Sequence, residues 1–221
     1  MLKALIFDMD GTMIDSMPWH QKSWTVFMRR HGLDMDMADL MRRTTGRTGL
    51  ECMRELFGDL DPARAQTYVD EKEALYRELF SPSFKEVAGF TDFLSVARSH
   101  GLAVGVGTAG DRHNQAFAYQ HLALDQPLTT VGGDEGLPGK PEPDIFLEVA
   151  RRLGVPPEHC IVFEDAPLGI EAARRAGMRA VGICSGHTAE ELGGPHVLAC
   201  VPDYQSLISS RFLETFHAAT A

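Results

Sequence analysis

Four acidic residues stand directly after short apolar runs of the sequence. Asp8 and Asp10 follow the run Leu2–Phe7, and a second pair, Glu164 and Asp165, follows a similar run. Ligands of open α/β sheets bind at the carboxyl ends of the strands, so we expect these carboxylates at one sheet edge. Carboxylates gathered in a low dielectric repel one another unless a cation lies among them, and hard oxygen ligands favour Mg²⁺. Each acid alone could be a helix N-cap, so the metal prediction rests on all four together.

Two further polar residues are expected at the same edge. Thr108 comes just after the apolar run Leu102–Val106, and Lys140 lies in the loop that follows a short run ending at Val131. The predicted site therefore holds four carboxylates, one hydroxyl group and one ammonium group.

The elements that position these residues follow a repeated pattern of helix, glycine and strand. The three units are Phe90–Ala97 with Gly101 and Leu102–Val106, Ile145–Leu153 with Gly154 and Cys160–Phe163, and Glu171–Ala176 with Gly177 and Arg179–Ile183. Such units indicate right-handed βαβ connections and a parallel sheet. With strands at Leu2–Phe7 and near Val131, they predict an α/β fold, a Rossmann-like parallel sheet with helices on both faces. Beyond Gly186 we predict only a helix at Ala189–Leu192.

The segment between the first strand and the repeated units is predicted to be helical. Residues 16–81 hold strong helix formers, and apolar residues recur at helical spacing around Phe27, Phe57 and Leu75. We therefore predict an inserted all-helical cap domain at residues 16–81. The α/β core domain would then comprise residues 1–15 and 82–221, with Ser81–Ser83 as the returning hinge.

Composition excludes several classes of function. The chain has 221 residues, with 31 acidic and 21 basic side chains and a net charge of −10. An acidic surface repels phosphate backbones, so we expect no nucleic-acid partner, although a local pocket can still bind a small phosphorylated molecule. The apolar runs fall short of the roughly 18 residues of a membrane span, and we expect no membrane association. The acid at Asp8 comes too early for a secretory signal.

The four cysteines carry no ligand pattern. Cys52, Cys160, Cys184 and Cys200 lie far apart, without a CxxC pair. Reduced, buried thiols are the better interpretation than zinc ligands or disulfides, and they favour a cytoplasmic location.

The residues just described resemble the motifs of the haloacid dehalogenase superfamily of aspartate-nucleophile phosphotransferases. The matching segments are Asp8-Met9-Asp10-Gly11-Thr12, Thr108, Gly139-Lys140-Pro141-Glu142-Pro143-Asp144 and Phe163-Glu164-Asp165-Ala166-Pro167-Leu168-Gly169-Ile170. The resemblance covers the whole chain, because the helical insertion lies where this family has its cap. It is strongest to β-phosphoglucomutase and the related phosphatases of small sugar phosphates.

The resemblance implies a role for each carboxylate of the first motif. Asp8 is expected to attack the phosphoryl group and form an aspartyl-phosphate, which water later hydrolyses. Asp10 is expected to protonate the leaving oxygen and then to deprotonate the attacking water. Because displacement of a halide needs no proton, the acid at Asp10 favours phosphoryl transfer over dehalogenation.

The other motifs would bind the phosphoryl group and a metal ion. Lys140 and Thr108, with backbone amides such as that of Ala109, are expected to contact the phosphoryl oxygens as catalytic and substrate-binding groups. Mg²⁺ would be held by Asp8, the main-chain carbonyl of Asp10 and Asp165. Glu164 would be either a further ligand or the residue that orients one.

Substrate contacts are expected from the cap. The candidates are His20, Trp24, Gly46 and Arg47, with Gly46 in a turn between helices. For Trp24, packing in the core of the cap is the better interpretation, whereas a structural role for His20 and an exposed surface position for Arg47 are even alternatives to substrate contact.

Two departures from the mutase pattern bear on the reaction. The arginine that is thought to grip the non-transferring phosphate in the mutase corresponds here to Gly49. The serine and asparagine that follow the second motif there are replaced by Gly110, Asp111 and Arg112, with Asn114 slightly displaced. Arg47 or Arg112 could take over the grip, but hydrolysis is the better prediction.

The sequence therefore predicts a Mg²⁺-dependent phosphatase acting on a small phosphorylated metabolite, most simply a sugar phosphate, as a monomer. The alternatives are a phosphomutase of the β-phosphoglucomutase type or a non-catalytic phosphate-binding regulatory protein. Loss of Asp8, Asp10 or Lys140 would have favoured the regulatory protein, and all three are present.

Overall fold

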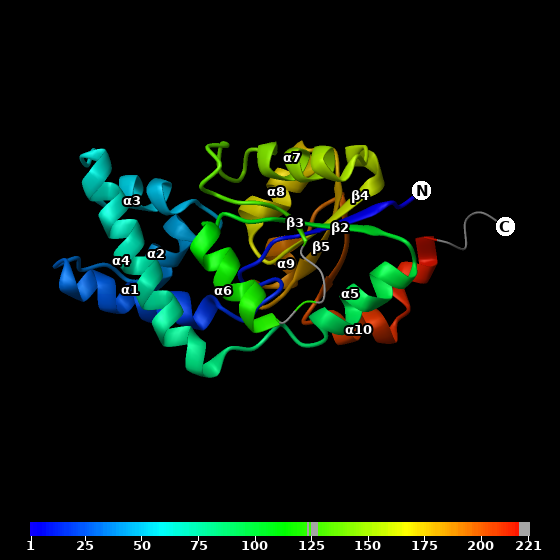
Figure 1. The fold of residues 1–221 in the computed structure, drawn as a ribbon, viewed down its shortest axis with the longest axis horizontal. Coiled ribbons are helices and arrows are strands. Elements are labelled where there is room, and N and C mark those ends of the chain that lie inside the picture. Colours follow the sequence, from blue (N-terminus) through cyan, green and yellow to red (C-terminus); the bar gives the residue numbers. More distant parts are fainter. Residues whose placement is uncertain (123, 125–127, 217–221) are drawn as a thin grey trace.

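A parallel β-sheet forms the centre of the computed structural model, which describes residues 1–122, 124 and 128–216 (Figure 1). Its six strands run parallel in the order β3-β2-β1-β4-β5-β6. They are β1 (Ala4–Phe7), β2 (Ala103–Gly107), β3 (Thr129–Val131), β4 (Cys160–Glu164), β5 (Arg179–Ile183) and β6 (Val197–Val201). From β1 the strand order continues to β2 and β3 on one side and to β4, β5 and β6 on the other. Ligands of such sheets bind at this switch in strand order, so a ligand crevice is expected at the carboxyl end of β1.

Helices cover both faces of the sheet (Figure 1). One face packs against α5 (Phe90–Ser99), α6 (Arg112–Leu122), α10 (Tyr204–Ser209) and the 3₁₀ turn Phe212–Phe216, and the other against α7 (Asp144–Leu153), α8 (Pro167–Arg175) and α9 (Ala189–Leu192). Along β1, Leu5 and Phe7 enter the first core cluster whereas Ala4 and Ile6 enter the second. This alternation buries both faces of β1, and the predicted fold class is confirmed.

An aromatic cluster fixes the ends of the two central strands. The rings of Phe7 and Phe163 stack with their centroids 4.7 Å apart, and Phe93 and Tyr204 pack edge-on or tilted against them. Each such pair contributes about 0.5–1.5 kcal/mol beyond the burial of its area. Because Phe7 immediately precedes Asp8, this packing holds the first acid of the chain in place.

Residues 17–80 form a helical insertion between β1 and the rest of the sheet. It consists of α1 (Met17–Arg30), α2 (Met37–Thr44), α3 (Gly49–Phe57) and α4 (Pro62–Phe80), followed by the 3₁₀ turn Ser81–Ser83. The insertion has its own buried cluster, which includes Trp24, Phe27 and Met53. In Figure 1 it lies beyond the carboxyl edge of the sheet. The division into two domains at residues 15 and 82 stays a prediction.

The two connections of the insertion lie side by side. Ile14 and Glu86 form an antiparallel bridge, and the Val87 amide donates to the carbonyl of Met13 at 3.0 Å. The two segments that connect the insertion to the sheet are therefore paired with each other.

The C-terminal part contains two elements that the sequence did not predict. Strand β6 lies at the edge of the sheet, and most of its residues are only partly buried, so it lacks the continuous burial of β4. Helix α10 is too short to show a helical period. The predicted helix at Ala189–Leu192 is present as α9.

A close approach of α7 to β2 gives a test of this packing. A Cβ atom at Gly105 would lie 2.4 Å from Val149 Cγ1 on α7. We expect Gly105→Ala to lower the free energy of unfolding by about 1–3 kcal/mol, as overpacked cores do. Gly186→Ala is the control, because there the nearest atoms are 3.9 and 4.0 Å away. Urea unfolding of both variants measures the difference, and equal stabilities would contradict the packing described here.

Candidate active site

The register of the central strands brings the acids of the first and fourth motifs together. Phe7 is aligned with Phe163 across the β1–β4 pair, so Asp8 and Glu164 lie level at adjacent strand ends. On the other side Phe7 is aligned with Val106, which places Thr108 just beyond the same edge. Pairing in register is what allows residues 150 positions apart to meet at one end of the sheet.

Lys140 lies between two of these acids. Its ammonium group donates to Asp8 Oδ1 at 2.5 Å and to Glu164 Oε1 at 2.6 Å, and its side chain is 1% exposed. The second oxygen of Glu164 accepts from the amide of Ala166 at 2.7 Å. Burial alone would favour the neutral amine, but the two carboxylates raise the pKa of Lys140. The lysine therefore stays charged and partly balances the acidic cluster.

The remaining negative charge forms a site that could hold a metal ion. One carboxylate oxygen from each of Asp8, Glu164 and Asp165 lies within 4.8 Å of the others. Asp165 Oδ1 accepts from the hydroxyl of Thr12 at 3.3 Å, whereas Oδ2 is buried and has no hydrogen-bond partner among the described residues. Gly11 leaves room for that oxygen, since a Cβ there would lie 2.2 Å from it. A cation fits this set of hard, buried oxygen donors.

The titration of the cluster agrees with that interpretation. Burial raises the pKa of Asp165 well above its ordinary value, and the charges of Glu164 and Asp8 raise it further. Burial also raises the pKa of Asp8, against the opposing charge of Lys140. Ionised carboxylates at these positions are therefore unfavourable without a further positive charge.

Asp10 has a different environment from Asp8. Its Oδ1 accepts from His20 Nε2 and from the hydroxyl of Tyr76, both at 3.1 Å, and both donors belong to the helical insertion. The rings of His20 and Tyr76 stack 3.9 Å apart. Burial alone would raise the pKa of Asp10. The interactions with His20, and to a smaller extent with Ser16 and Lys72, more than offset burial and lower the pKa of Asp10 to about 2. In this arrangement Asp10 is ionised and acts as a hydrogen-bond acceptor.

A buried polar chain extends from Asp10 through the insertion. Lys72 Nζ lies 2.7 Å from His20 Nδ1 and 2.9 Å from Glu73 Oε1. Glu73 Oε2 in turn accepts from Asn114 Nδ2 at 2.7 Å. Because an ammonium group can only donate, His20 Nδ1 must accept, and the ring proton is therefore on Nε2, facing Asp10.

Sequence reasoning missed the members of this chain on α4, namely Lys72, Glu73 and Tyr76. The one available signal was a charge at a core-facing position: Lys72 lies between Val69 and Tyr76 on the buried stripe of α4 and is only 3% exposed. A lysine there needs a partner inside the protein, since lysines are rarely buried unpaired.

A cavity lies above the acidic cluster, between the sheet edge and the insertion. It is lined by Asp8, Asp10, Met17, His20, Trp24, Met41, Thr44, Thr45, Gly46, Arg47, Gly49, Cys52, Met53, Lys72, Glu73, Thr108, Ala109, Gly110, Asn114, Glu164, Asp165 and Ala166. All but one of the site residues predicted from the sequence are in this lining. The exception is Lys140, which lies behind Asp8 and contacts it directly.

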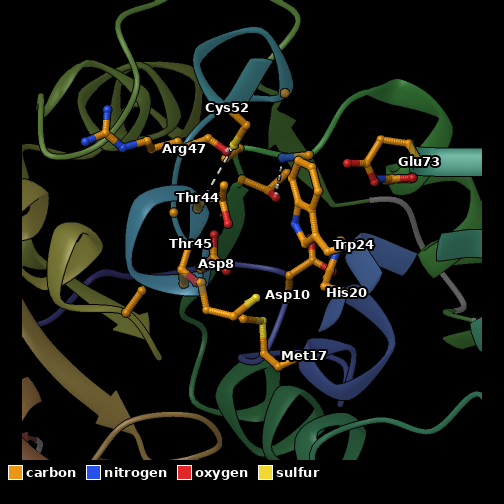
Figure 2. A pocket seen from close by; sticks show the side chains of 18 of the residues that line it. Asp8, Asp10, Met17, His20, Trp24, Thr44, Thr45, Arg47, Cys52 and Glu73 are labelled. Atoms are coloured by element: carbon orange, nitrogen blue, oxygen red, sulfur yellow. Dashed lines mark hydrogen bonds and ion pairs between the residues drawn. The ribbon is translucent and has the colours of Figure 1, made fainter. Parts of the chain in front are cut away.

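The four cap candidates differ in how they meet the cavity. Trp24 is buried and also packs edge-on against Phe27, so it serves both the cavity wall and the core of the insertion. Figure 2 shows the guanidinium group of Arg47 pointing away from the cavity, and its side chain is exposed. His20 faces Asp10, and Gly46 has φ +81° in a turn where a Cβ atom would lie 3.5 Å from Leu168 Cβ of α8.

The model of the haloacid dehalogenase-like hydrolase family matches residues 2–177 of this sequence. The chain belongs to this family. The predicted membership of the haloacid dehalogenase superfamily is therefore confirmed.

Two curated relatives of the family cover most of the chain. Validoxylamine A 7′-phosphate phosphatase of Streptomyces hygroscopicus subsp. limoneus is 33% identical over 199 residues, covering 90% of this chain and 93% of that protein. Fructose-1-phosphate phosphatase of Escherichia coli is 37% identical over 188 residues, covering 81% of this chain and 95% of that protein. Among solved structures, β-phosphoglucomutase of Clostridium difficile has a TM-score of 0.84, 24% identity and 99% coverage of both chains, a likeness of fold.

The structure gives physical reasons for the two departures from the mutase pattern. Gly49 begins α3, and a Cβ there would lie 2.6 Å from Val69 Cγ1, so a larger side chain would displace α4. Asp111 accepts from the amides of His113 and Asn114, both at 2.9 Å, and so caps α6 with a carboxylate.

Within the described residues, no helix has the length and apolar character required to cross a membrane.

The charge on Asp165 gives a test of the acidic cluster. A carboxyl with a raised folded-state pKa contributes most stability below its unfolded pKa, and this contribution is lost as the pH rises. In a chelating buffer at pH 8, Asp165→Asn should therefore raise the Tm, by about 2–4 °C for each kcal/mol recovered. The gain should shrink at pH 4, where Asp165 is protonated. Asp59→Asn, at an exposed site, should change neither value in thermal scans. A lower Tm for Asp165→Asn at pH 8 would contradict the cluster's repulsion.

Proposed function

We propose that this protein is a Mg²⁺-dependent phosphatase that hydrolyses a small phosphorylated metabolite, a sugar phosphate, through an aspartyl-phosphate. The observation that carries the proposal is the pair Asp8 and Asp10 at the floor of one cavity. Asp8 is held by Lys140, while Asp10 faces hydrogen-bond donors of the insertion. Two carboxylates with different environments can take different roles.

In the first half-reaction an oxygen of Asp8 attacks phosphorus. The new bond joins Asp8 to the phosphoryl group, and the bond from phosphorus to the sugar oxygen breaks. Asp10, in its protonated form, gives its proton to that leaving oxygen. Lys140 and Thr108 lie where they can balance and orient the charge on the phosphoryl oxygens.

In the second half-reaction water attacks the aspartyl-phosphate. Asp10, now ionised, takes the proton of the water, and the bond from phosphorus to Asp8 breaks to release phosphate. The low pKa of Asp10 beside His20 suits this step, because it keeps the base ionised. The first step requires that the proton be available on Asp10 when the substrate is bound.

Mg²⁺ would be held by Asp8, Asp165 and the main-chain carbonyl of Asp10. When bound, the ion supplies positive charge that stabilises the transferring phosphoryl group. Glu164 already contacts Lys140 and the amide of Ala166, so we assign it to orienting the cluster.

We expect added Mg²⁺ to raise the Tm of the wild type and to have little effect on the Tm of Asp165→Asn.

The class of substrate is supported by the cavity and by the relatives. Trp24, Met41 and Met53 give the cavity an apolar wall, while Asp10, Glu73 and Thr108 offer polar groups for hydroxyls. The two curated relatives named above are phosphatases, one of validoxylamine A 7′-phosphate and one of fructose 1-phosphate. Hydrolysis is favoured over a mutase reaction, because Gly49 carries no cation for a second phosphate.

We propose further that the enzyme acts as a monomer in the cytoplasm. The exposed large apolar side chains of the described residues are Met1, Leu50, Leu147 and Leu198, and no two of them belong to the same helix or strand. The four free cysteines suit a reducing compartment.

Phosphate release from a panel of sugar phosphates, with and without Mg²⁺, tests the proposed function. We expect release that requires Mg²⁺ and that falls to background in Asp8→Asn, since the nucleophile is lost. Asp59→Asn is the matched control, because Asp59 is an exposed carboxylate in the loop that follows α3. This variant should keep wild-type rates. Mg²⁺-dependent release that persists in Asp8→Asn would refute the aspartyl-phosphate mechanism.

The role of Asp10 is tested by changing the leaving group. A sugar alkoxide needs a proton as it departs, whereas p-nitrophenolate is stable as the anion. Asp10→Ala should therefore slow turnover of a sugar phosphate by about 10²–10⁴-fold, the usual range for general acid–base catalysis. With p-nitrophenyl phosphate it should give a burst of product and a stalled, phosphorylated enzyme.

Rapid-mix kinetics and the mass of acid-quenched protein detect that burst and the added phosphoryl group. Asp8→Asn should show neither. Near wild-type turnover of both substrates by Asp10→Ala would show that another group moves the proton.

A further inference from the structure

Glu73 is a cavity-lining carboxylate that the proposed mechanism does not use. It projects from α4, its side chain is 13% exposed, and it lies across the cavity from Arg47 (Figure 2). Its two oxygens have separate partners, Lys72 Nζ at 2.9 Å and Asn114 Nδ2 at 2.7 Å. Arg77 fixes Asn114 from the other side by donating to its Oδ1 at 2.7 Å. The carboxylate is thus held in one orientation by both the insertion and α6.

The charge of Glu73 persists inside the cavity wall. Burial alone would raise its pKa, but Lys72, His20 and Asn114 together hold the pKa of Glu73 below its usual value. Each oxygen accepts one hydrogen bond from the protein and keeps a second lone pair. Glu73 can therefore accept a hydrogen bond from a hydroxyl group in the cavity.

Among the described residues of the same wall, no uncommitted ammonium or guanidinium group points into the cavity. Lys72 is shared between His20 and Glu73, and Lys140 between Asp8 and Glu164. The guanidinium group of Arg47, the other basic side chain in the described lining, points away from the cavity (Figure 2). A second anionic group on a substrate would meet the carboxylate of Glu73 without compensation, and like charges in a partly desolvated site repel strongly.

We infer that Glu73 is a specificity-determining residue, which accepts a hydroxyl of the leaving group and rejects leaving groups that carry a second negative charge. The substrates are then monophosphates of uncharged polyols. This inference rests on the proposed phosphatase function and adds to it the chemical class of the leaving group.

Two substrates of the same length and configuration separate charge from size. Glucitol 6-phosphate ends in a hydroxymethyl group where 6-phosphogluconate ends in a carboxylate. For the wild type with Mg²⁺ we expect kcat/KM, measured by phosphate release, to favour glucitol 6-phosphate by at least about tenfold. Glu73→Gln should bring this ratio close to one, chiefly by a gain on 6-phosphogluconate. Glu73→Asp, which keeps the charge, should retain most of the preference.

Glu78→Gln is the matched control, because Glu78 lies on the same helix, is exposed and is outside the cavity lining. It should keep the wild-type ratio. A fall in kcat/KM for both substrates alike in Glu73→Gln would show a merely structural role and overturn the inference. The wild-type comparison also tests it without any variant, since equal rates on the two substrates would overturn it while leaving the phosphatase function intact. Failure to release phosphate from any monophosphate would instead refute the proposed function, and the inference with it.

Discussion

The ammonium group of Lys140, buried between Asp8 and Glu164, is the interaction on which the rest of the site depends. Three acids meet at the ends of two adjacent strands, and burial makes their mutual repulsion large. One lysine offsets part of that charge and fixes the orientation of the Asp8 and Glu164 carboxylates. The aromatic stacking of Phe7 on Phe163 holds the two strand ends in register, so the repulsion cannot be relieved by separating them. The negative charge that Lys140 does not balance could hold a cation.

The helical insertion completes the site through polar contacts rather than through apolar packing alone. From Asp10 the hydrogen bonds run through His20, Lys72 and Glu73 to Asn114 on α6, so this series of contacts begins and ends outside the insertion. A fully partnered polar chain of this kind fixes one arrangement, since loss of any member leaves a buried charge unpaired. The insertion therefore supplies both the hydrogen-bond donors to Asp10 and part of the polar lining of the cavity.

The motif residues could be predicted from the sequence because each stands at a strand end, and the ends of parallel strands share an edge. Asp8, Thr108 and Glu164 needed only the apolar runs before them to be placed. Lys72 and Glu73 could not be placed in this way, because helical periodicity indicates which face of α4 is buried but not what that face meets. The direction of Arg47 depends on a turn whose path has no signal in the sequence. Strand β6 was missed although Val197–Val201 is a continuous apolar run, because the helix before it has only four residues and shows no helical period to mark another helix–strand unit.

The antiparallel bridge between Ile14 and Glu86 also has a topological consequence. Where two chain segments pair in this way, a turn of about two residues is enough to join them. The segments before and after the insertion are therefore already next to each other, and the strand order of the sheet does not depend on what is inserted between them. Asp8 belongs to the sheet segment, whereas much of the cavity lining belongs to the inserted segment. The lining of the cavity can therefore change while the acidic cluster at the strand ends keeps its arrangement.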